Sequence, residues 1–190
     1  MRLVLASASP RRLDLLARIG VVPDAVVPAD VDESVPRGEL PRDHALRLAR
    51  EKALAVAARE PDSLVLAADT VVAVGRRILR KVEDEATLRA CMKLLSGRRH
   101  RVLTGVALAA SGQPLRTRLG ETMIAMKPLS EEEIDYYAAH GEWRGKAGGY
   151  ALQGYGEVYV RHIAGSYSNV VGLPLAETRV LLKAAGYPIA

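Results

Sequence analysis

The chain has 190 residues, of which 49% are hydrophobic and 26% are charged, and its formal net charge is +5. This length suits one large domain or two small lobes that share a core, and the composition excludes a disordered or fibrous chain. The positive charge favours an anionic partner, but aromatic residues make up only 4% of the chain and the basic residues are scattered, so nucleic-acid binding is not indicated.

The N-terminus resembles an export signal only superficially. The apolar run before Ser7 is far shorter than the roughly 7–15 residues that an export core needs, and we find no later segment long enough to cross a bilayer. Cys91 is the single cysteine, so no internal disulfide can form, which suits a reducing compartment. We therefore expect a cytoplasmic protein with no membrane contact.

The first predicted elements are a strand over residues 3–6 and a helix over residues 10–19, which ends at Gly20. Ser9 stands at the N-cap position and Pro10 at the first helical position. The amides at such a helix start have no intrahelical partner, and the helix dipole adds positive potential where they converge. The junction is therefore suited to bind phosphate.

Hydroxyl and guanidinium groups surround this junction. Ser7 and Ser9 precede the helix, and Arg11 and Arg12 supply forked donors that match phosphate oxygens. We predict that all four side chains contact phosphate. Taken alone, the segment is equally consistent with a well-capped helix that carries two solvated arginines.

A polar, proline-rich loop leads to a second predicted helix over residues 41–59, which has apolar side chains on one face. A buried strand over residues 64–68 follows. Asp69 and Thr70 stand at the carboxyl end of this strand, before an apolar run over residues 71–74. Ligands bind at that end of the strands in α/β sheets.

A third helix is predicted over residues 84–95, followed by two paired strands over residues 101–108 and 113–126. Ser130 begins a capping box that opens a fourth helix, which ends near Gly141.

Two further strands are predicted near residues 157–163 and 167–171, and a last helix begins at Pro174 and stops at Gly186. Because hairpin-like pairs alternate with helical crossovers, the sequence predicts an α/β fold with a mixed sheet.

Short motifs along nearly the whole chain carry a resemblance to a known family. They are SASPRR (7–12), VDE (31–33), LAREKA (48–53), ADTVV (68–72), LLSG (94–97) with His100, KAGGY (146–150), GSY (165–167) and VVGLPL (170–175). The chain resembles the Maf family of nucleoside triphosphate pyrophosphatases. The resemblance implies one domain over residues 1–190, with an elongated, two-lobed mixed sheet flanked by helices and a central cleft. It also implies a divalent metal, a homodimer, and hydrolysis of a nucleoside triphosphate to the monophosphate and pyrophosphate.

That reaction explains the residue types. Water must attack the α-phosphorus while pyrophosphate leaves, so the site needs carboxylates, a hard cation and basic groups together. We expect Glu33 and Asp69 to be the catalytic carboxylates and to bind Mg²⁺ or Mn²⁺. The resemblance implies Asp69 as the general base, but a carboxyl pKa near ~3.9 is poor for a base at neutral pH, so a role as metal ligand stays open. Viewed alone, Asp69 is more typical of a turn or cap at a strand end, and only the full set of motifs favours the catalytic role.

Lys52, Lys81 and Lys146 are further candidates, because the chain uses arginine for most of its other basic positions. We predict that Lys52 and Lys146 bind phosphate and that Lys81 takes part in catalysis; a solvated surface position is the alternative for each. Family members usually carry proline after this lysine, whereas Val82 follows here and Arg80 adds a charge before it. We expect this difference to loosen the segment and to affect the rate of the reaction rather than its type.

Arg11, Thr70 and Gln153 align with positions that separate branches of the family, and they match the branch acting on dTTP and UTP. An amide that both donates and accepts suits the edge of thymine or uracil, although Gln153 alone is equally typical of a turn. We expect hydrolysis of dTTP and UTP, with modified pyrimidine nucleotides that the cell must remove as further substrates. The alternative is a non-hydrolytic nucleotide- or nucleic-acid-binding regulator of septum formation.

Overall fold

A long mixed sheet forms the centre of the computed structural model, which describes residues 1–189. The strand order is β2-β1-β3-β6-β7-β9, with β4 paired to β3 as well. The strands are β1 Arg2–Ala6, β2 Ala25–Val26, β3 Ser63–Val74, β4 Arg77–Leu79, β6 Arg99–Ala109, β7 Arg116–Met126 and β9 Val160–Ala164. The β1–β2 and β1–β3 pairs are parallel and the others antiparallel, which confirms the predicted mixed sheet.

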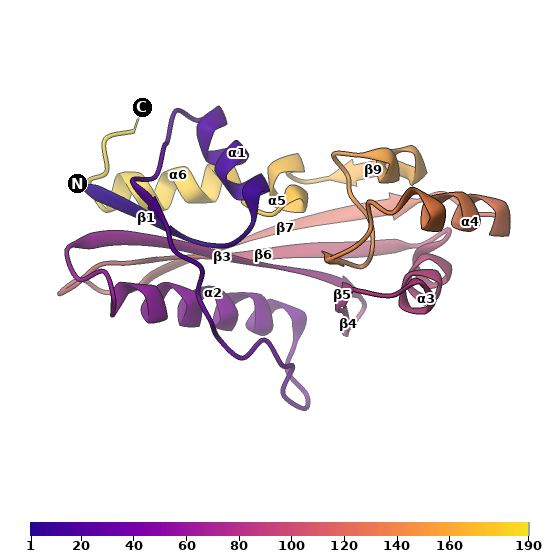
Figure 1. Cartoon of the computed structure of the whole chain (residues 1–190), viewed down its shortest axis with the longest axis horizontal. Coiled ribbons are helices and arrows are strands. Elements are labelled where there is room, and N and C mark those ends of the chain that lie inside the picture. Colours follow the sequence, from indigo (N-terminus) through magenta and orange to yellow (C-terminus); the bar gives the residue numbers. More distant parts are fainter. Residues whose placement is uncertain (190) are drawn as a thin grey trace.

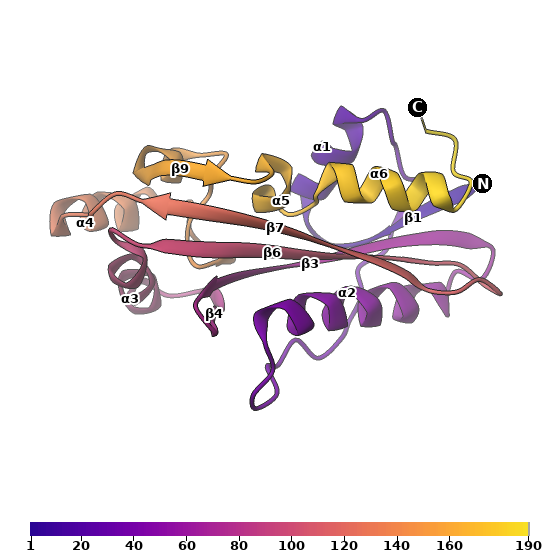
Figure 2. The same ribbon diagram turned by 180° about the vertical axis from the view of Figure 1, so that it is seen from behind.

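Strands β3, β6 and β7 run along most of the length of the molecule (Figure 1). Helices cover both faces of the sheet at the N-terminal end: α1 (Pro10–Arg18) and α6 (Leu175–Ala184) lie on one face, and α2 (Pro41–Ala57) lies on the other (Figures 1 and 2). Helices α3 (Glu85–Leu95) and α4 (Glu131–His140) lie at the opposite end, and the short α5 (Tyr167–Val171) lies between the two groups.

Separate apolar clusters stabilise the two ends. Alternate residues of β3 point to opposite faces, so Leu64 and Leu66 pack under α1 and α6, while Val65 and Ala67 pack against α2. The far end has its own core, which includes the fully buried Trp143 and residues of α3 and α4. This arrangement confirms the elongated, two-lobed architecture. None of the helices within residues 1–189 is long and apolar enough to span a membrane.

Most predicted helices are confirmed to within two residues. Helix α4 has the complete capping box: the Ser130 hydroxyl accepts from the Glu133 amide, and the Glu133 carboxylate accepts from the Ser130 amide. Gly20 and Gly141 end α1 and α4 with φ of 70° and 80°, which a side chain would disfavour.

Three local predictions are wrong. Residues 167–171 form helix α5 rather than a strand, because Ser166 caps a turn there and accepts a hydrogen bond from the Asn169 amide. Residues 157–159 belong to a 3₁₀ turn (Tyr155–Tyr159), and strand β9 begins only at Val160. Asp69 and Thr70 do not end a strand: they lie inside the continuous β3, which runs from Ser63 to Val74.

The pairing of β3 leaves a gap that the sequence does not predict. On one edge, β1 pairs with β3 as far as Ala67, and β4 pairs with it from Val72 onward. Within the described chain, residues 68–71 have no strand partner on this edge, although β6 pairs with them on the other. Asp69 and Thr70 therefore lie at an open section of this edge, between the part of β3 that pairs with β1 and the part that pairs with β4.

Candidate functional site

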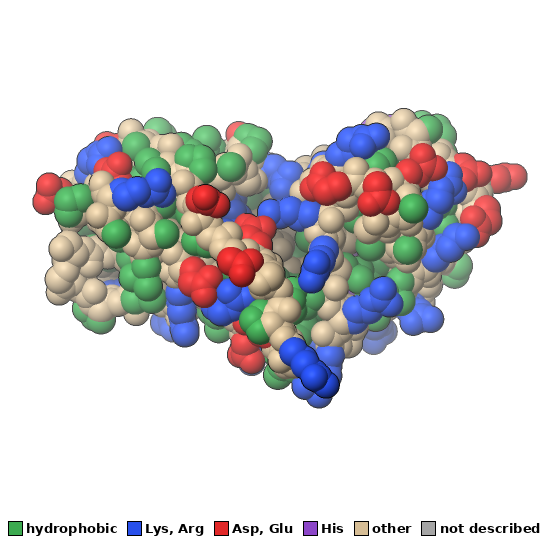
Figure 3. Space-filling model, turned by 60° about the horizontal axis from the view of Figure 1, so that its bottom comes forward, with side chains coloured by type: hydrophobic (Ala, Val, Ile, Leu, Met, Phe, Trp, Pro, Cys, Tyr) green, Lys and Arg blue, Asp and Glu red, His purple; other side chains and the backbone are tan. Residues whose placement is uncertain are grey.

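The open section of β3 borders a cleft of about 390 Å³ between the two ends of the molecule. Figure 3 shows a hollow at this place, with basic and acidic side chains on its walls. The cleft brings together every residue that the sequence predicts for the site. These residues are Ser7, Ser9, Arg11, Arg12, Glu33, Lys52, Asp69, Thr70, Lys81, Lys146 and Gln153.

Three ion pairs connect the acidic residues of the cleft. Lys52 Nζ lies 2.6 Å from both Glu33 Oε1 and Asp69 Oδ1, and Lys81 Nζ lies 2.8 Å from Glu33 Oε2. The Lys52 and Asp69 side chains are each only 10% exposed. A buried charge is costly unless it is paired, so this chain of alternating charges holds the two carboxylates in fixed positions.

Glu33 is ionised over the whole physiological range. Burial works to raise its pKa, but the hydrogen bonds and charges of Lys52 and Lys81 outweigh burial and lower the pKa to about 2. Glu33 therefore serves as a fixed negative charge, available to a cation.

Lys52 of α2 reaches Asp69 because the helix packs closely against the sheet at Gly105. Gly105 pairs with Asp69 in the neighbouring strand, and its position faces the backbone of α2. A Cβ atom at Gly105 would stand 2.3 Å from the carbonyl oxygen of Ala45. Only glycine permits this approach, which in turn lets the Lys52 ammonium reach the Asp69 carboxylate.

A loop between β2 and α2 presents Glu33, and its shape is set by local hydrogen bonds. The Asp32 carboxylate accepts from the Ser34 amide at 2.8 Å and from the Ser34 hydroxyl at 2.9 Å, which forms a tight Asx turn. Arg47 of α2 donates to the Ser34 carbonyl oxygen at 2.9 Å and to Glu39 at 2.7 Å. These bonds fasten the loop on both sides of Glu33 to the helix that carries Lys52.

The N-terminal junction supplies donors on the opposite wall. Arg12 Nη1 donates to Ser7 Oγ at 3.0 Å and Arg12 Nε donates to the carbonyl oxygen of Gly172 at 2.8 Å. Ser9 is confirmed as the N-cap residue of α1, with Pro10 at the first helical position, although the Ser9 side chain makes no capping hydrogen bond. Its amide instead donates to Ser7 Oγ. Burial lowers the pKa of Arg11 and of Arg12, yet an arginine stays cationic at neutral pH.

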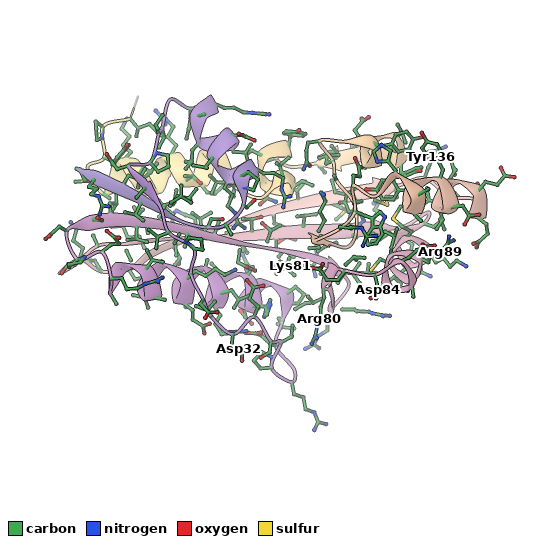
Figure 4. All side chains as sticks on the ribbon, viewed as in Figure 1. Asp32, Arg80, Lys81, Asp84, Arg89 and Tyr136 are labelled. Carbon is green, nitrogen blue, oxygen red and sulfur yellow. The ribbon has the colours of Figure 1, made fainter. Side chains whose placement is uncertain are left out.

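Lys81 and Lys146 come together in a two-stranded ladder, β5 (Lys81–Val82) with β8 (Lys146–Ala147), that the sequence does not reveal. Val82 stands where family members usually carry proline, and it is fully buried in the core of the far lobe. Packing and the pairing with β8 therefore hold this segment in place without the proline. Lys81 and the exposed Arg80 lie between α2 and α3 in Figure 4. Lys146 Nζ donates to the Glu142 carbonyl oxygen. Burial and the positive charge of Arg11 lower the pKa of Lys146, although the negative charge of Glu142 works to raise it.

The donor chemistry of the cleft fits a hard divalent cation. No group of three or more His, Cys, Asp or Glu side chains within residues 1–189 is arranged to hold a metal by itself. Glu33 and Asp69 nevertheless direct carboxylate oxygens at one point, now taken by the Lys52 ammonium. Mg²⁺ is commonly bound by one or two carboxylates, with the remaining ligands supplied by water and substrate phosphates.

Several side chains behind the cleft were not predicted as part of the site, although His100 and Tyr150 fall within the family motifs. The hydroxyl groups of Thr104 and Thr70 lie 2.9 Å apart, and Thr104 also donates to the carbonyl oxygen of Asn169 at 3.0 Å. Tyr150 lines the cleft, and its hydroxyl lies 2.7 Å from His100 Nε2. Polar residues inside otherwise apolar strands were the available signal for Thr104 and His100.

Five basic side chains and two carboxylates meet in one cleft beside a helix start. The fold and this arrangement define the class: an α/β protein equipped to hold a polyanionic, phosphate-bearing ligand. A family model described as Maf-like protein matches residues 2–185. The chain belongs to the Maf family.

Curated relatives are similar over nearly their whole length. A Caulobacter vibrioides protein named dTTP/UTP pyrophosphatase is 63% identical over 185 residues, which cover 97% of this chain and 96% of that protein. A Zymomonas mobilis protein of the same name is 58% identical over 187 residues, covering 98% and 93%. Among solved structures, a HAM1 protein from Coxiella burnetii has a TM-score of 0.53 at 14% identity, covering 97% of this chain and 99% of that one. This last likeness shows the fold alone.

Proposed function

We propose that this protein is a nucleoside triphosphate pyrophosphatase that converts dTTP and UTP to the monophosphate and pyrophosphate. One observation carries the proposal: the carboxylates Glu33 and Asp69 lie in the same cleft as the start of α1 and three lysines. The names of the relatives, with identities of 58% and 63%, support the substrate class.

The cationic wall binds and orients the triphosphate. Ser7, Ser9, Arg11 and Arg12 hold phosphate oxygens at the start of α1, and the bond from Arg12 to Gly172 fixes the guanidinium before substrate arrives. Preorganised donors of this kind stabilise charge that develops on the leaving pyrophosphate. Lys81 and Lys146, which come from the opposite lobe, supply further positive charge.

Asp69 acts on the attacking water. Lys52 Nζ holds Oδ1 of the carboxylate at 2.6 Å, which fixes the direction of the second oxygen. We assign to Oδ2 the orientation of the water and acceptance of its proton as the water attacks the α-phosphorus.

A divalent cation, Mg²⁺ or Mn²⁺, would be held by Glu33 and Asp69. When bound, it supplies Lewis-acid polarisation of the phosphoryl oxygens. The fixed charge of Glu33, whose pKa is lowered to about 2, keeps this binding possible at any physiological pH.

An apolar wall receives the base. Val72 and Val102 are paired neighbours on adjacent strands and line the cleft with Leu152. Gln153, which is exposed at the rim, offers both a donor and an acceptor to the edge of a pyrimidine.

We test the function with the purified protein, Mg²⁺ and separate samples of dTTP, UTP, CTP, ATP and GTP, measuring released pyrophosphate. dTTP and UTP should react fastest. Asp69→Asn should abolish turnover while nucleotide binding, followed by calorimetry, is largely retained. Asp62→Asn, the same change at an exposed aspartate just before β3, should leave turnover intact. Absence of pyrophosphate with every nucleotide would refute the proposal, whereas equal rates for all bases would refute only the substrate class.

A regulator that binds nucleotides without hydrolysing them is not favoured. Binding of an anion alone gains nothing from two nearby carboxylates, yet both Glu33 and Asp69 are held in the cleft. The family resemblance further supports a homodimer in the cytoplasm. Light scattering of the purified protein should then give twice the chain mass of 20.5 kDa.

A further inference from the structure

A chain of hydrogen-bonding groups runs from the cleft through the sheet. Arg12 Nη2 lies 3.5 Å from Thr70 Oγ1, and Thr70 Oγ1 lies 2.9 Å from Thr104 Oγ1. Thr104 Oγ1 lies 3.0 Å from the backbone carbonyl oxygen of Asn169. Thr70 lines the cleft, whereas Thr104 and Asn169 are both 0% exposed.

The two ends of this chain fix the direction of every hydrogen bond in it. A carbonyl oxygen can only accept, so Thr104 uses its single hydroxyl proton on Asn169. Thr104 must then accept from Thr70, which uses the Thr70 proton. A guanidinium can only donate, so Arg12 agrees with this direction at the other end.

Thr70 therefore offers the cleft an acceptor and no donor. Phosphate oxygens need donors, so they are unsuited to this hydroxyl. The neighbouring apolar wall shows what lies there instead: Val72 is on the same face of β3 as Thr70, and Val102 and Thr104 lie opposite them on β6. A flat base that rests on Val72 and Val102 directs its edge toward Thr70.

We propose that Thr70 accepts the N3–H of uracil or thymine, and that Thr104 and Asn169 set this polarity from behind the site. Cytosine carries an unprotonated N3, which is an acceptor, so its lone pair would face the lone pair of Thr70. The protein would thereby distinguish UTP from CTP because the hydroxyl proton of Thr70 points away from the cleft, toward Thr104. This inference rests on the proposed pyrophosphatase function and specifies how that site selects its base.

Hydrogen bonds of the Asn169 side chain hold in place the backbone carbonyl oxygen of Asn169, which ends this series of hydrogen bonds. Asn169 Nδ2 donates to the Val102 carbonyl oxygen at 3.0 Å and to Thr122 Oγ1 at 2.9 Å. Thr122 in turn donates to the Ser166 carbonyl oxygen and accepts from the Ser166 amide. These bonds hold α5 on the sheet, so the carbonyl of Asn169 has one position and Thr104 one direction in which to donate.

Thr104→Val tests the inference because it removes the hydroxyl and leaves a similar shape. Without Thr104 as acceptor, the Thr70 proton is free to turn toward the cleft and donate to cytosine N3. The ratio of kcat/KM for UTP to that for CTP should fall about tenfold, as expected when one buried hydrogen bond decides the preference. Thr104→Ser, which restores the hydroxyl, should restore the ratio.

Thr178→Val is the matched control. Thr178 is also 0% exposed, but its hydroxyl donates to the backbone carbonyl oxygen of Pro174 at 2.8 Å and is not part of the hydrogen bonds that link Thr70 to Asn169. Its UTP-to-CTP ratio should equal that of the wild type. If Thr104→Val folds poorly, Thr70→Val, which lacks the acceptor at a half-buried position, should show the same fall.

An unchanged ratio in either threonine variant would overturn the inference. A change in preference between UTP and dUTP, with the ratio of UTP to CTP constant, would also overturn it, because Thr70 would then contact a sugar hydroxyl. Failure of the wild type to hydrolyse UTP is a separate result and would refute the proposed function itself.

Discussion

Gly105→Ala should separate the packing of α2 from the chemistry it supports. The added Cβ would lie 2.3 Å from the Ala45 carbonyl oxygen, 2.6 Å from its carbon and 2.9 Å from the Leu46 nitrogen. All three are backbone atoms, which cannot swing aside as a side chain does. Normal contact begins near 3.4 Å, so the helix must move away from the sheet by about 1 Å.

The expected magnitudes follow from this displacement. Overpacking a core contact costs about 1–3 kcal/mol of unfolding free energy. Lys52 lies two turns beyond Ala45 on α2, and its ammonium contacts Asp69 at 2.6 Å, a distance that a shift of the helix lengthens directly. Misplacing a catalytic group by 1 Å costs about a hundredfold in rate, so kcat with UTP should fall by about that factor.

Two measurements are needed: urea unfolding followed by circular dichroism, and steady-state pyrophosphate release from UTP. Gly112→Ala is the control. Gly112 has φ of 70° and no atoms within 4 Å of its Cβ position, so alanine there strains the backbone without displacing α2. It should lower stability and keep kcat. A folded Gly105→Ala protein with reduced stability and wild-type kcat would refute the argument that this glycine sets the position of Lys52.

Three further predictions concern acid stability and helix capping. Burial works to raise the pKa of Glu33, but Lys52 and Lys81 outweigh it and lower the pKa from 4.5 to about 2. Because Glu33 takes up its proton at a higher pH in the unfolded chain, the free energy of unfolding should fall as the pH drops from 4.5 toward 2. Urea titrations at several pH values should show a steeper fall for the wild type than for Glu33→Gln. Burial lowers the pKa of His100 from 6.5 to about 4, so the melting temperature should decline as pH falls from about 6.5 toward 4, and His100→Gln should flatten that decline. Ser130→Ala breaks the capping box of α4 and should cost about 1 kcal/mol in urea unfolding while UTP turnover is unchanged; a loss of turnover would contradict the separation of α4 from the cleft.

Local signals explain why most helices could be predicted from the sequence. Asp84 and Ser130 cap α3 and α4 through bonds to residues three positions on, and Gly20 and Gly186 stop α1 and α6 in left-handed turns. Such signals depend on neighbours along the chain.

Elements fixed by distant contacts could not be predicted. Val170 and Val171 favour a strand by propensity, yet they form α5 because Asn169 is bound to two strands of the sheet. The polar pair Asp69 and Thr70 indicated a strand end, whereas they occupy the open section of a continuous strand. A two-residue ladder such as β5 with β8 is too short to leave a periodic pattern.

The sequence could predict which residues share the cleft, but not how they contact one another. Family motifs indicated Glu33, Lys52 and Asp69 separately. That Lys52 bridges the two carboxylates depends on how closely α2 approaches β6, which a single glycine permits. The direction of the Thr70 hydroxyl depends on a carbonyl far along the chain.

The most direct test of the account follows the oxygen atom of the attacking water. UTP is hydrolysed in ¹⁸O-labelled water with the wild-type protein and Mg²⁺, and both products are examined by mass spectrometry. Attack at the α-phosphorus, beside Asp69, predicts one ¹⁸O atom in UMP and none in pyrophosphate. Label in pyrophosphate, or release of inorganic phosphate in its place, would contradict the account.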